Sequence, residues 1–230
     1  MRDPYFPFHA LGFRANPFRA LTDEEWAAIV VLPEAILTAA RSASHIQVLG
    51  EMGRGKTSTL LGLARQFRRA GQRATYEYLA IGQDRFRTPL PGPEVFLLDE
   101  AQRLRTSERR RLVGAASGGL RLILGSHEDL TALFAGAGLP LSTVRLEAFG
   151  PGHLAAVLEQ RLAAASLPGT APVVTFDPGA LDYLHATFGS NLRAAEHFLY
   201  EVFQRLEALG PLTGEQMRAF ASAYPDARNS

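Results

Sequence analysis

The chain has 230 residues and a formal net charge of +1, with 47% hydrophobic and 20% charged residues. This composition predicts a packed globular protein rather than a disordered chain, and the small net charge argues against a dedicated polyanion binder. The lack of cysteine excludes disulfides and thiolate metal sites. No apolar run approaches the ~20 residues that span a bilayer. The first residues lack the apolar core of a secretory signal, so we expect a cytoplasmic protein with no membrane span.

The N-terminal residues 1–20 are expected to form an ordered arm rich in proline and aromatic residues. Its aromatic side chains either pack in a core or border an adenine pocket or partner surface; they are Tyr5, Phe6, Phe8, Phe13 and Phe18. Thr22 and Glu25 then match a capping box, which predicts a helix over residues 22–41 that Pro33 breaks or kinks.

Short apolar segments alternate with helical patterns up to about residue 150. They predict strands at 45–49, 74–79, 95–98, 120–124 and 143–146, and helices at 56–70, 107–117 and 128–134. The stretch 80–94 is rich in proline and glycine and is not expected to hold a full helix.

After residue 150 the pattern becomes helical, at 153–165, 178–188, 191–208 and 213–223, with a candidate extended stretch at 173–176 and no other strand. The predicted fold class is therefore α/β, a P-loop NTPase parallel sheet flanked by helices, followed by a small helical lid. We assign residues 1–20 to the arm, 21–150 to the α/β domain and 151–230 to the lid.

A phosphate-binding loop is predicted because residues 50–57 fit the pattern G-x-x-x-x-G-K-[ST] in full, between a predicted strand and a predicted helix. The glycines let backbone N–H groups face an anion, and the helix adds its positive dipole end. Lys56, which is the only lysine of the chain, would reach the β- and γ-phosphates of ATP, and Thr57 would ligate Mg²⁺. The predicted ATP contacts are Gly50, Glu51, Met52, Gly53, Arg54, Gly55, Lys56, Thr57 and Ser58.

Two carboxylates follow the predicted strand at 95–98. The carboxyl ends of parallel strands face the ligand-binding edge of a sheet, so Asp99 would hold Mg²⁺, and Glu100 would orient and activate the attacking water. At the end of the strand at 120–124, Ser126 is the better candidate for contacting the γ-phosphate or this water, and His127 is the next. Either residue could instead simply begin the following helix as its N-cap.

Together these residues resemble the AAA+ ATPases, and within them the bacterial ExeA-type and TniB/TnsC-type transposition ATPases, with origin-recognition ATPases as more distant relatives. The resemblance covers roughly residues 12 to 210. It is carried by Asn16-Pro17-Phe18, by Asp99–Leu104 as a "DEAQ-x-L" form of the acidic motif, by Leu124-Gly125-Ser126, by Val144–Phe149 and by Gly189–Arg193.

The resemblance implies that Arg193 is a sensor arginine reaching the γ-phosphate from the lid, and that the protein forms a homo-oligomer. DNA, or a protein client of the transposition or secretion type, is implied as a partner. Arginine clusters that could grip DNA phosphates, or be merely solvated, lie at 65–73, 85–87 and 103–111.

The sequence departs from the AAA+ pattern in two places. The segment 80–94 is too short and too rich in proline for the usual second helix. The segment 137–142 lacks the arginine that these proteins often direct at a neighbouring subunit's ATP, and Arg145 lies within a predicted strand.

Three functions therefore compete. The first is an ATP-hydrolysing switch that controls assembly or the engagement of DNA or a protein. The second is an ATP-dependent scaffold with little hydrolysis. The third, a small-molecule kinase, is opposed by the acidic pair and the helical lid.

Overall fold

The computed structural model describes residues 8–146, 150–169, 173–189, 191–206 and 209–225. The chain divides into two compact units, one formed by Thr22–Glu147 and the other by Met1–Leu21 together with Ala148–Ser230. Each unit contains its own cluster of buried hydrophobic side chains and is described by itself. Among the described helices, none combines the length and the apolar character needed to cross a membrane.

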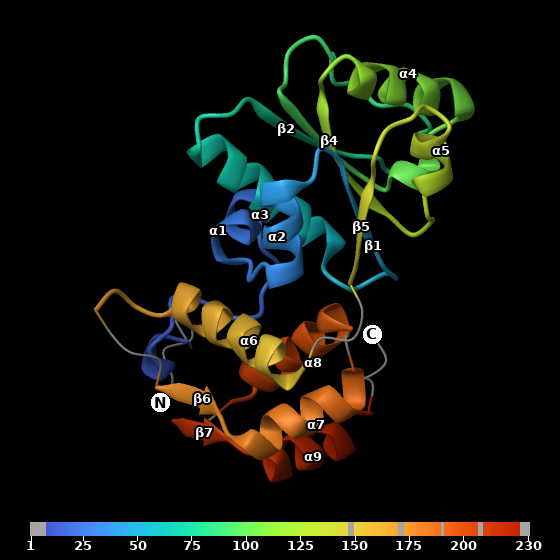
Figure 1. Ribbon diagram of the computed structural model, residues 1–230. Helices are drawn as coiled ribbons and strands as arrows, with labels where there is room; N and C mark the ends of the chain where they lie inside the picture. The colour runs from blue at the N-terminus through green and yellow to red at the C-terminus, as the bar shows by residue number, and fades with distance from the viewer. Residues whose placement is uncertain (1–7, 147–149, 170–172, 190, 207–208, 226–230) are drawn as a thin grey trace. The chain divides into compact units, whose positions relative to one another are not determined.

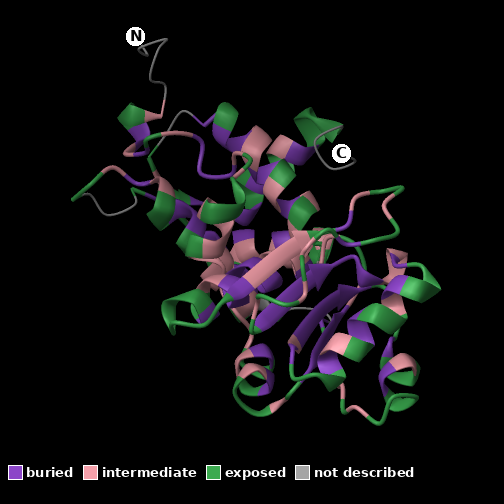
Figure 2. Cartoon of the chain, turned by 90° about the horizontal axis from the view of Figure 1, so that it is seen from above, coloured by how far each residue is buried: buried purple, intermediate pink, exposed green. Residues whose placement is uncertain are grey.

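The unit Thr22–Glu147 is built on a parallel 5-stranded sheet with the order β2-β3-β4-β1-β5 (Figure 1). Its strands are β1 (Ile46–Leu49), β2 (Ala74–Tyr78), β3 (Val95–Asp99), β4 (Arg121–Ser126) and β5 (Ser142–Arg145). Every residue of β1 and β3 is buried, as expected for parallel strands covered on both faces. Figure 2 shows these central strands mainly in the colour of buried residues.

Helices cover both faces of this sheet. One face carries α1 (Asp23–Ile29), α2 (Glu34–Ser42) and α3 (Lys56–Arg69), and the other carries α4 (Thr106–Ser117) and α5 (Thr131–Ala135) (Figure 1). Successive side chains of a strand point to opposite faces. Phe96 and Leu98 pack in the cluster with α4 and α5. Asp99, at the end of the same strand, therefore lies on the face covered by α3.

These elements confirm the predicted α/β fold class, a parallel sheet flanked by helices. The predicted break at Pro33 is also confirmed, because α1 ends at Ile29 and Pro33 is the N-cap of α2. The capping box of Thr22 and Glu25 is present in both directions. Between β2 and β3 the chain forms turns without a helix, as the proline- and glycine-rich composition of 80–94 predicted.

The second unit contains the 3₁₀ turn η1 (His9–Leu11), four α-helices and two short strands within its described residues. They are α6 (Pro151–Ala165), β6 (Val174–Phe176), α7 (Pro178–Phe188), α8 (Leu192–Gln204), β7 (Gly210–Leu212) and α9 (Gly214–Ala223). β6 confirms the extended stretch expected near 173–176. The prediction of no other strand was wrong, because β6 pairs in parallel with β7. The sequence Gly210-Pro211-Leu212 is too short and too poor in β-formers to signal a strand locally.

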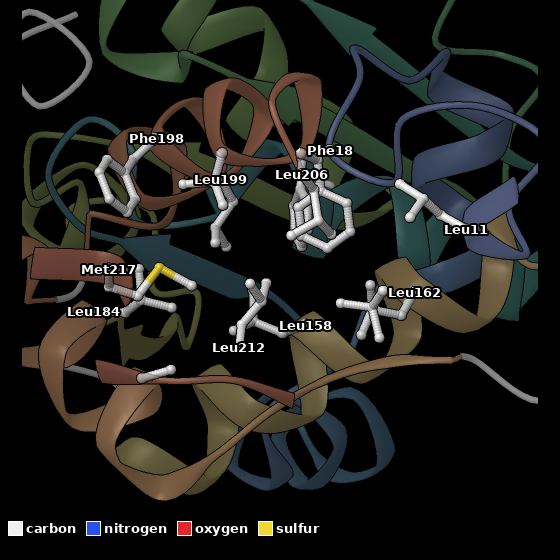
Figure 3. Close-up of a cluster of buried hydrophobic side chains, with 14 of the residues drawn as sticks. Leu11, Phe18, Leu158, Leu162, Leu184, Phe198, Leu199, Leu206, Leu212 and Met217 are labelled. Atoms are coloured by element: carbon white, nitrogen blue, oxygen red, sulfur yellow. The ribbon is translucent and has the colours of Figure 1, made fainter. Parts of the chain in front are cut away.

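The N-terminal segment belongs to the core of this second unit. The Asn16 Nδ2 donates to the backbone oxygen of Tyr200 in α8 at 3.0 Å, and the Asn16 Oδ1 accepts from the Phe18 N at 2.9 Å. The centre of the Phe18 ring lies 5.1 Å from the centre of the Phe203 ring. Figure 3 shows Phe18 among the buried side chains of the helices. Of the two alternatives for the N-terminal aromatic residues, Phe13 and Phe18 are core residues, and Phe8 packs against the same cluster.

Some predicted positions lie outside the described residues. They are Tyr5 and Phe6 of the arm, residues 147–149 after the last strand, and Ser190 before α8.

Candidate phosphate and hydrolysis site

The loop between β1 and α3 has the backbone shape that an anion site requires. Gly53 and Gly55 have φ angles of 80° and 82°, in the left-handed region that side chains with a Cβ rarely adopt. Gly55 is the N-cap of α3 and supplies no side-chain cap. The first N–H groups of α3 therefore point toward the loop with the positive end of the helix dipole behind them, which suits a phosphate.

Lys56 is buried at the beginning of α3, with 5% of its surface exposed. Its Nζ donates to the backbone oxygens of Gly50 and Glu51, each at 2.8 Å. The ammonium group also lies 3.2 Å from the Nε2 of His127. A buried cation held by neutral oxygens and an imidazole is in position to attract an anion. The other charged side chains of the loop, Glu51 and Arg54, pair with each other at 3.0 Å.

Asp99 is fully buried at the end of β3. Its Oδ2 accepts from the Thr57 Oγ1 at 2.6 Å, and its Oδ1 accepts from the Glu100 N at 3.0 Å. Burial raises the pKa of the Asp99 carboxyl, while these two hydrogen bonds and the charge of Lys56 act in the opposite direction. Burial also raises the pKa of the Tyr76 hydroxyl, which donates to Asp99 Oδ2 at 3.4 Å.

Gly125, in the neighbouring strand β4, leaves the room that this carboxylate occupies. A Cβ at residue 125 would lie 2.4 Å from the Asp99 Oδ1 and 3.3 Å from a methyl carbon of Leu60. The position thus needs glycine for space rather than for its backbone angle. The predicted family element Leu124-Gly125-Ser126 therefore has a local steric reason.

Glu100 directly follows β3 and has a φ of 60°, and among the described residues it alone has a positive φ without being glycine. This conformation begins the 3₁₀ helix η2 (Ala101–Arg103). The Glu100 Oε2 accepts a hydrogen bond from Gln102 Nε2 at 2.8 Å and forms an ion pair with Arg103 Nη2 at 2.9 Å. Its Oε1 lies 3.2 Å from the Nε2 of His127. A strained backbone at a residue with this many polar contacts is typical of a functional position.

Ser126 and His127, the two candidates at the end of β4, have different positions. The Ser126 Oγ donates to the Glu128 backbone oxygen at 2.7 Å and accepts from the Glu128 N at 3.0 Å. It therefore organises its own turn. His127 contacts both Lys56 and Glu100 at 3.2 Å through the same nitrogen. The geometry brings His127, rather than Ser126, between the ammonium and the carboxylate.

Arg193 lies in the other unit, as the second residue of α8, and is exposed. Asn191 caps this helix by accepting from the Ala194 N at 3.2 Å. Within the unit, Glu196 carries a carboxyl whose pKa is raised to about 7 by burial, against the charges of Arg161 and Arg193. The role of Arg193 toward a nucleotide stays a prediction.

The donor set fits Mg²⁺ that arrives with phosphate groups. The Thr57 hydroxyl and the Asp99 carboxylate are adjacent oxygen ligands of the kind Mg²⁺ prefers. Among the described residues, no group of three or more His, Cys, Asp or Glu side chains could hold a metal by itself. Protein Mg²⁺ sites commonly use one or two carboxylates together with substrate phosphates and waters.

The sequence predicted Lys56, Thr57, Asp99 and Glu100 for the site, and these residues lie at one edge of the sheet. Gln102 and Arg103 were not predicted to take part in the site, although both contact the Glu100 carboxylate. Both lie inside the predicted DEAQ-x-L element, which was the available signal.

Solved structures are similar to this chain in fold. The chain is similar to AMPPCP-bound DnaA from Aquifex aeolicus, with a TM-score of 0.55 and 16% identity over 81% of this chain and 66% of that chain. It is also similar to a DNA replication initiation factor, with a TM-score of 0.58 and 16% identity over 90% of this chain and 71% of that chain. The chain has the AAA+ ATPase fold.

A further AAA+ neighbour is NtrX from Brucella abortus in complex with ATP, with a TM-score of 0.50 and 16% identity over 85% of this chain and 56% of that chain. This chain thus spans slightly less than two thirds of the DnaA structure and about half of NtrX. No family model matches the chain, and no curated protein matches it. The AAA+ fold is shown by these neighbours, while the narrower ExeA or TniB/TnsC likeness rests on the sequence motifs.

Proposed function

We propose that this chain binds ATP with Mg²⁺ at the loop 50–57 and hydrolyses it to ADP and phosphate. This proposal rests on one observation: a buried ammonium group, a hydroxyl and two carboxylates lie together at one edge of the sheet. Lys56 lies at the beginning of α3, Thr57 donates to Asp99 at 2.6 Å, and the Glu100 carboxylate is connected to Lys56 through His127. The DnaA and NtrX neighbours, which are bound to AMPPCP or ATP, support this proposal.

In the proposed reaction the loop amides and Lys56 bind the β- and γ-phosphates, and Ser58 adds a hydroxyl in the first turn of α3. Thr57 and Asp99 would hold Mg²⁺ when it is bound. When bound, Mg²⁺ would neutralise charge on the β- and γ-phosphate oxygens. Glu100 accepts a hydrogen bond from the attacking water and orients it toward the γ-phosphorus. His127 or Ser126 contacts the γ-phosphate or this water, and the contacts of His127 favour it for this role.

We further propose that the hydrolysis serves a switch that controls assembly of a homo-oligomer, or its engagement of DNA or a protein client. The supporting features are the AAA+ fold, the DEAQ-x-L element and the candidate sensor Arg193. One DnaA neighbour is bound to single-stranded DNA as well as AMPPCP, which motivates testing DNA first. The resemblance to transposition and secretion ATPases points to the class of client.

A scaffold that binds ATP with little hydrolysis is the second candidate. Two features favour this candidate. Residues 137–142 contain no arginine, and the Glu100 carboxylate already contacts the side chains of Gln102, Arg103 and His127. Phosphate release measured over a range of protein concentrations, with and without DNA, separates the candidates. Transfer of phosphate to a small acceptor would instead favour a kinase.

The decisive experiment compares three variants by calorimetric ATP binding with Mg²⁺ and by phosphate release. Lys56→Ala should lose most of the ATP affinity, and Glu100→Gln should keep affinity but lose turnover by about 10²-fold or more. Arg41→Ala is the matched control, because Arg41 forms an exposed ion pair with Glu34 on α2 and should change neither quantity. Unchanged affinity in Lys56→Ala, or no ATP affinity in the wild type, would refute the proposal.

A further inference from the structure

The two oxygens of the Glu100 carboxylate lie in different surroundings. Oε2 accepts a hydrogen bond from Gln102 Nε2 at 2.8 Å and forms an ion pair with Arg103 Nη2 at 2.9 Å. Oε1 faces the His127 Nε2 at 3.2 Å, on the side where Lys56 lies. A carboxylate offers about four lone-pair positions. Oε2 therefore has two side-chain partners, while Oε1, which has one, retains a position toward the phosphate side.

Arg103 is itself fixed from its other side. Its Nη1 donates to the backbone oxygen of Leu79, just after β2, and to the hydroxyl of Tyr78 at 3.4 Å. The guanidinium carbon lies 5.7 Å from the centre of the Tyr78 ring. The planar fork thus joins the carboxyl end of β2 to the residue that follows β3. An arginine can do this because its separate N–H groups point at two partners at once.

Arg103 lies only three residues after Glu100 and also holds its backbone. The Arg103 backbone N donates to the Glu100 backbone oxygen at 3.0 Å, which closes the turn that begins at the positive φ of Glu100. Backbone and side chain of Glu100 are therefore both held by residue 103. The Arg103 side chain is 25% exposed and the Glu100 side chain 12%, so this pair is better shielded than the Arg41–Glu34 pair at 65% and 75%.

We propose that Arg103 is a positioning residue for Glu100, which rests on the hydrolysis proposed above. By anchoring Oε2, Arg103 leaves Oε1 as the oxygen that receives the hydrogen bond of the attacking water. Without this anchor the carboxylate would keep only its contacts with Gln102 and His127 and could shift. A displacement of about 1 Å in a reacting group can lower a rate by up to about 10²-fold. ATP binding does not depend on the anchor, because Arg103 contacts neither the loop 50–57 nor Asp99 in the hydrogen bonds and ion pairs of the described residues.

The test compares kcat, KM and ATP affinity for Arg103→Ala, Arg103→Lys and the control Arg41→Ala. Arg103→Ala should lower kcat by about 10-fold, because the Glu100 carboxylate is then partly misplaced. The KM and the ATP affinity should stay within about twofold of the wild-type values. Arg103→Lys should recover part of the loss, because one ammonium can reach Oε2 but cannot also hold Leu79. Melting temperatures show whether each variant is folded.

A second readout separates positioning from a structural role. In single-turnover measurements, Arg103→Ala should cause no further loss in a Glu100→Gln background, since residues that act as a unit are not additive. An additive loss there, or a wild-type or raised kcat in Arg103→Ala, would overturn the inference while leaving the proposed function intact. A wild type that binds ATP without turnover would overturn both the hydrolysis and this inference.

Discussion

Gly125 offers a test of the site through a single methyl group. In Gly125→Ala the new Cβ would lie 2.4 Å from the Asp99 Oδ1, whereas real Cβ contacts are essentially never under 3.0 Å. The carboxylate must therefore move by about 0.6 Å or rotate, since the Leu60 methyl at 3.3 Å blocks a shift of strand β4 toward α3. Either movement disturbs the 2.6 Å hydrogen bond between Thr57 and Asp99.

Gly125→Ala is expected to lower the activity that depends on Mg²⁺. A displacement of this size should lower turnover with Mg²⁺-ATP by about 10-fold, whereas ATP affinity in the presence of a chelator should change little, because the loop amides and Lys56 are untouched. Overpacking should also lower the unfolding free energy by about 1–3 kcal/mol. Calorimetric titration with and without Mg²⁺, together with thermal melting, measures both effects.

Gly114→Ala is the matched control. Gly114 lies in α4, its φ is not positive, and a Cβ there meets nothing within 4 Å. The same substitution should therefore stabilise the protein by about 0.5–1 kcal/mol without changing turnover. The steric reasoning about Asp99 is refuted if Gly125→Ala keeps wild-type Mg²⁺-ATP turnover and stability.

Three further outcomes are expected. His127→Ala should lower phosphate release more than Ser126→Ala does, whereas Ser126→Ala should mainly lower the melting temperature, because its hydroxyl holds the Glu128 backbone. Burial raises the pKa of Glu196 from 4.5 to about 7, so the folded state keeps a proton that the unfolded state releases. As the pH rises from about 4.5 to about 7, the unfolding free energy of the wild type should therefore fall relative to that of Glu196→Gln. Urea titrations at several pH values measure both free energies. Phe18→Ala should lower the unfolding free energy by about 3–5 kcal/mol, read from the same titrations at one pH.

Local patterns were sufficient to predict most of the α/β unit. The loop 50–57 and the strand before Asp99 carry their own signals, because glycines, a lysine and an apolar run must stand at fixed spacings. The capping box at Thr22 and the break at Pro33 are equally local. These features depend on chemistry within a few residues, which a single sequence contains.

Other features depend on partners that are distant along the chain. Strand β7 exists because Gly210–Leu212 lies beside β6, and its own residues favour no strand. The orientation of Ser126 and His127 depends on the turn to Glu128, and Arg103 pairs with Glu100 across a turn in which Glu100 has a left-handed backbone. No periodicity predicts these directions, which are set by contacts between neighbouring strand ends.

The joining of the N-terminal segment to α8 has a consequence for how the chain is made. Asn16 and Tyr200, which share a hydrogen bond, are 184 residues apart. At a synthesis rate of about 5–20 residues per second, Asn16 and the aromatic rings beside it must wait roughly 10 to 40 s for their partners. The unit Thr22–Glu147 is complete well before then and can fold first. During translation Phe18 therefore lacks its native neighbour Phe203 until α8 has been made.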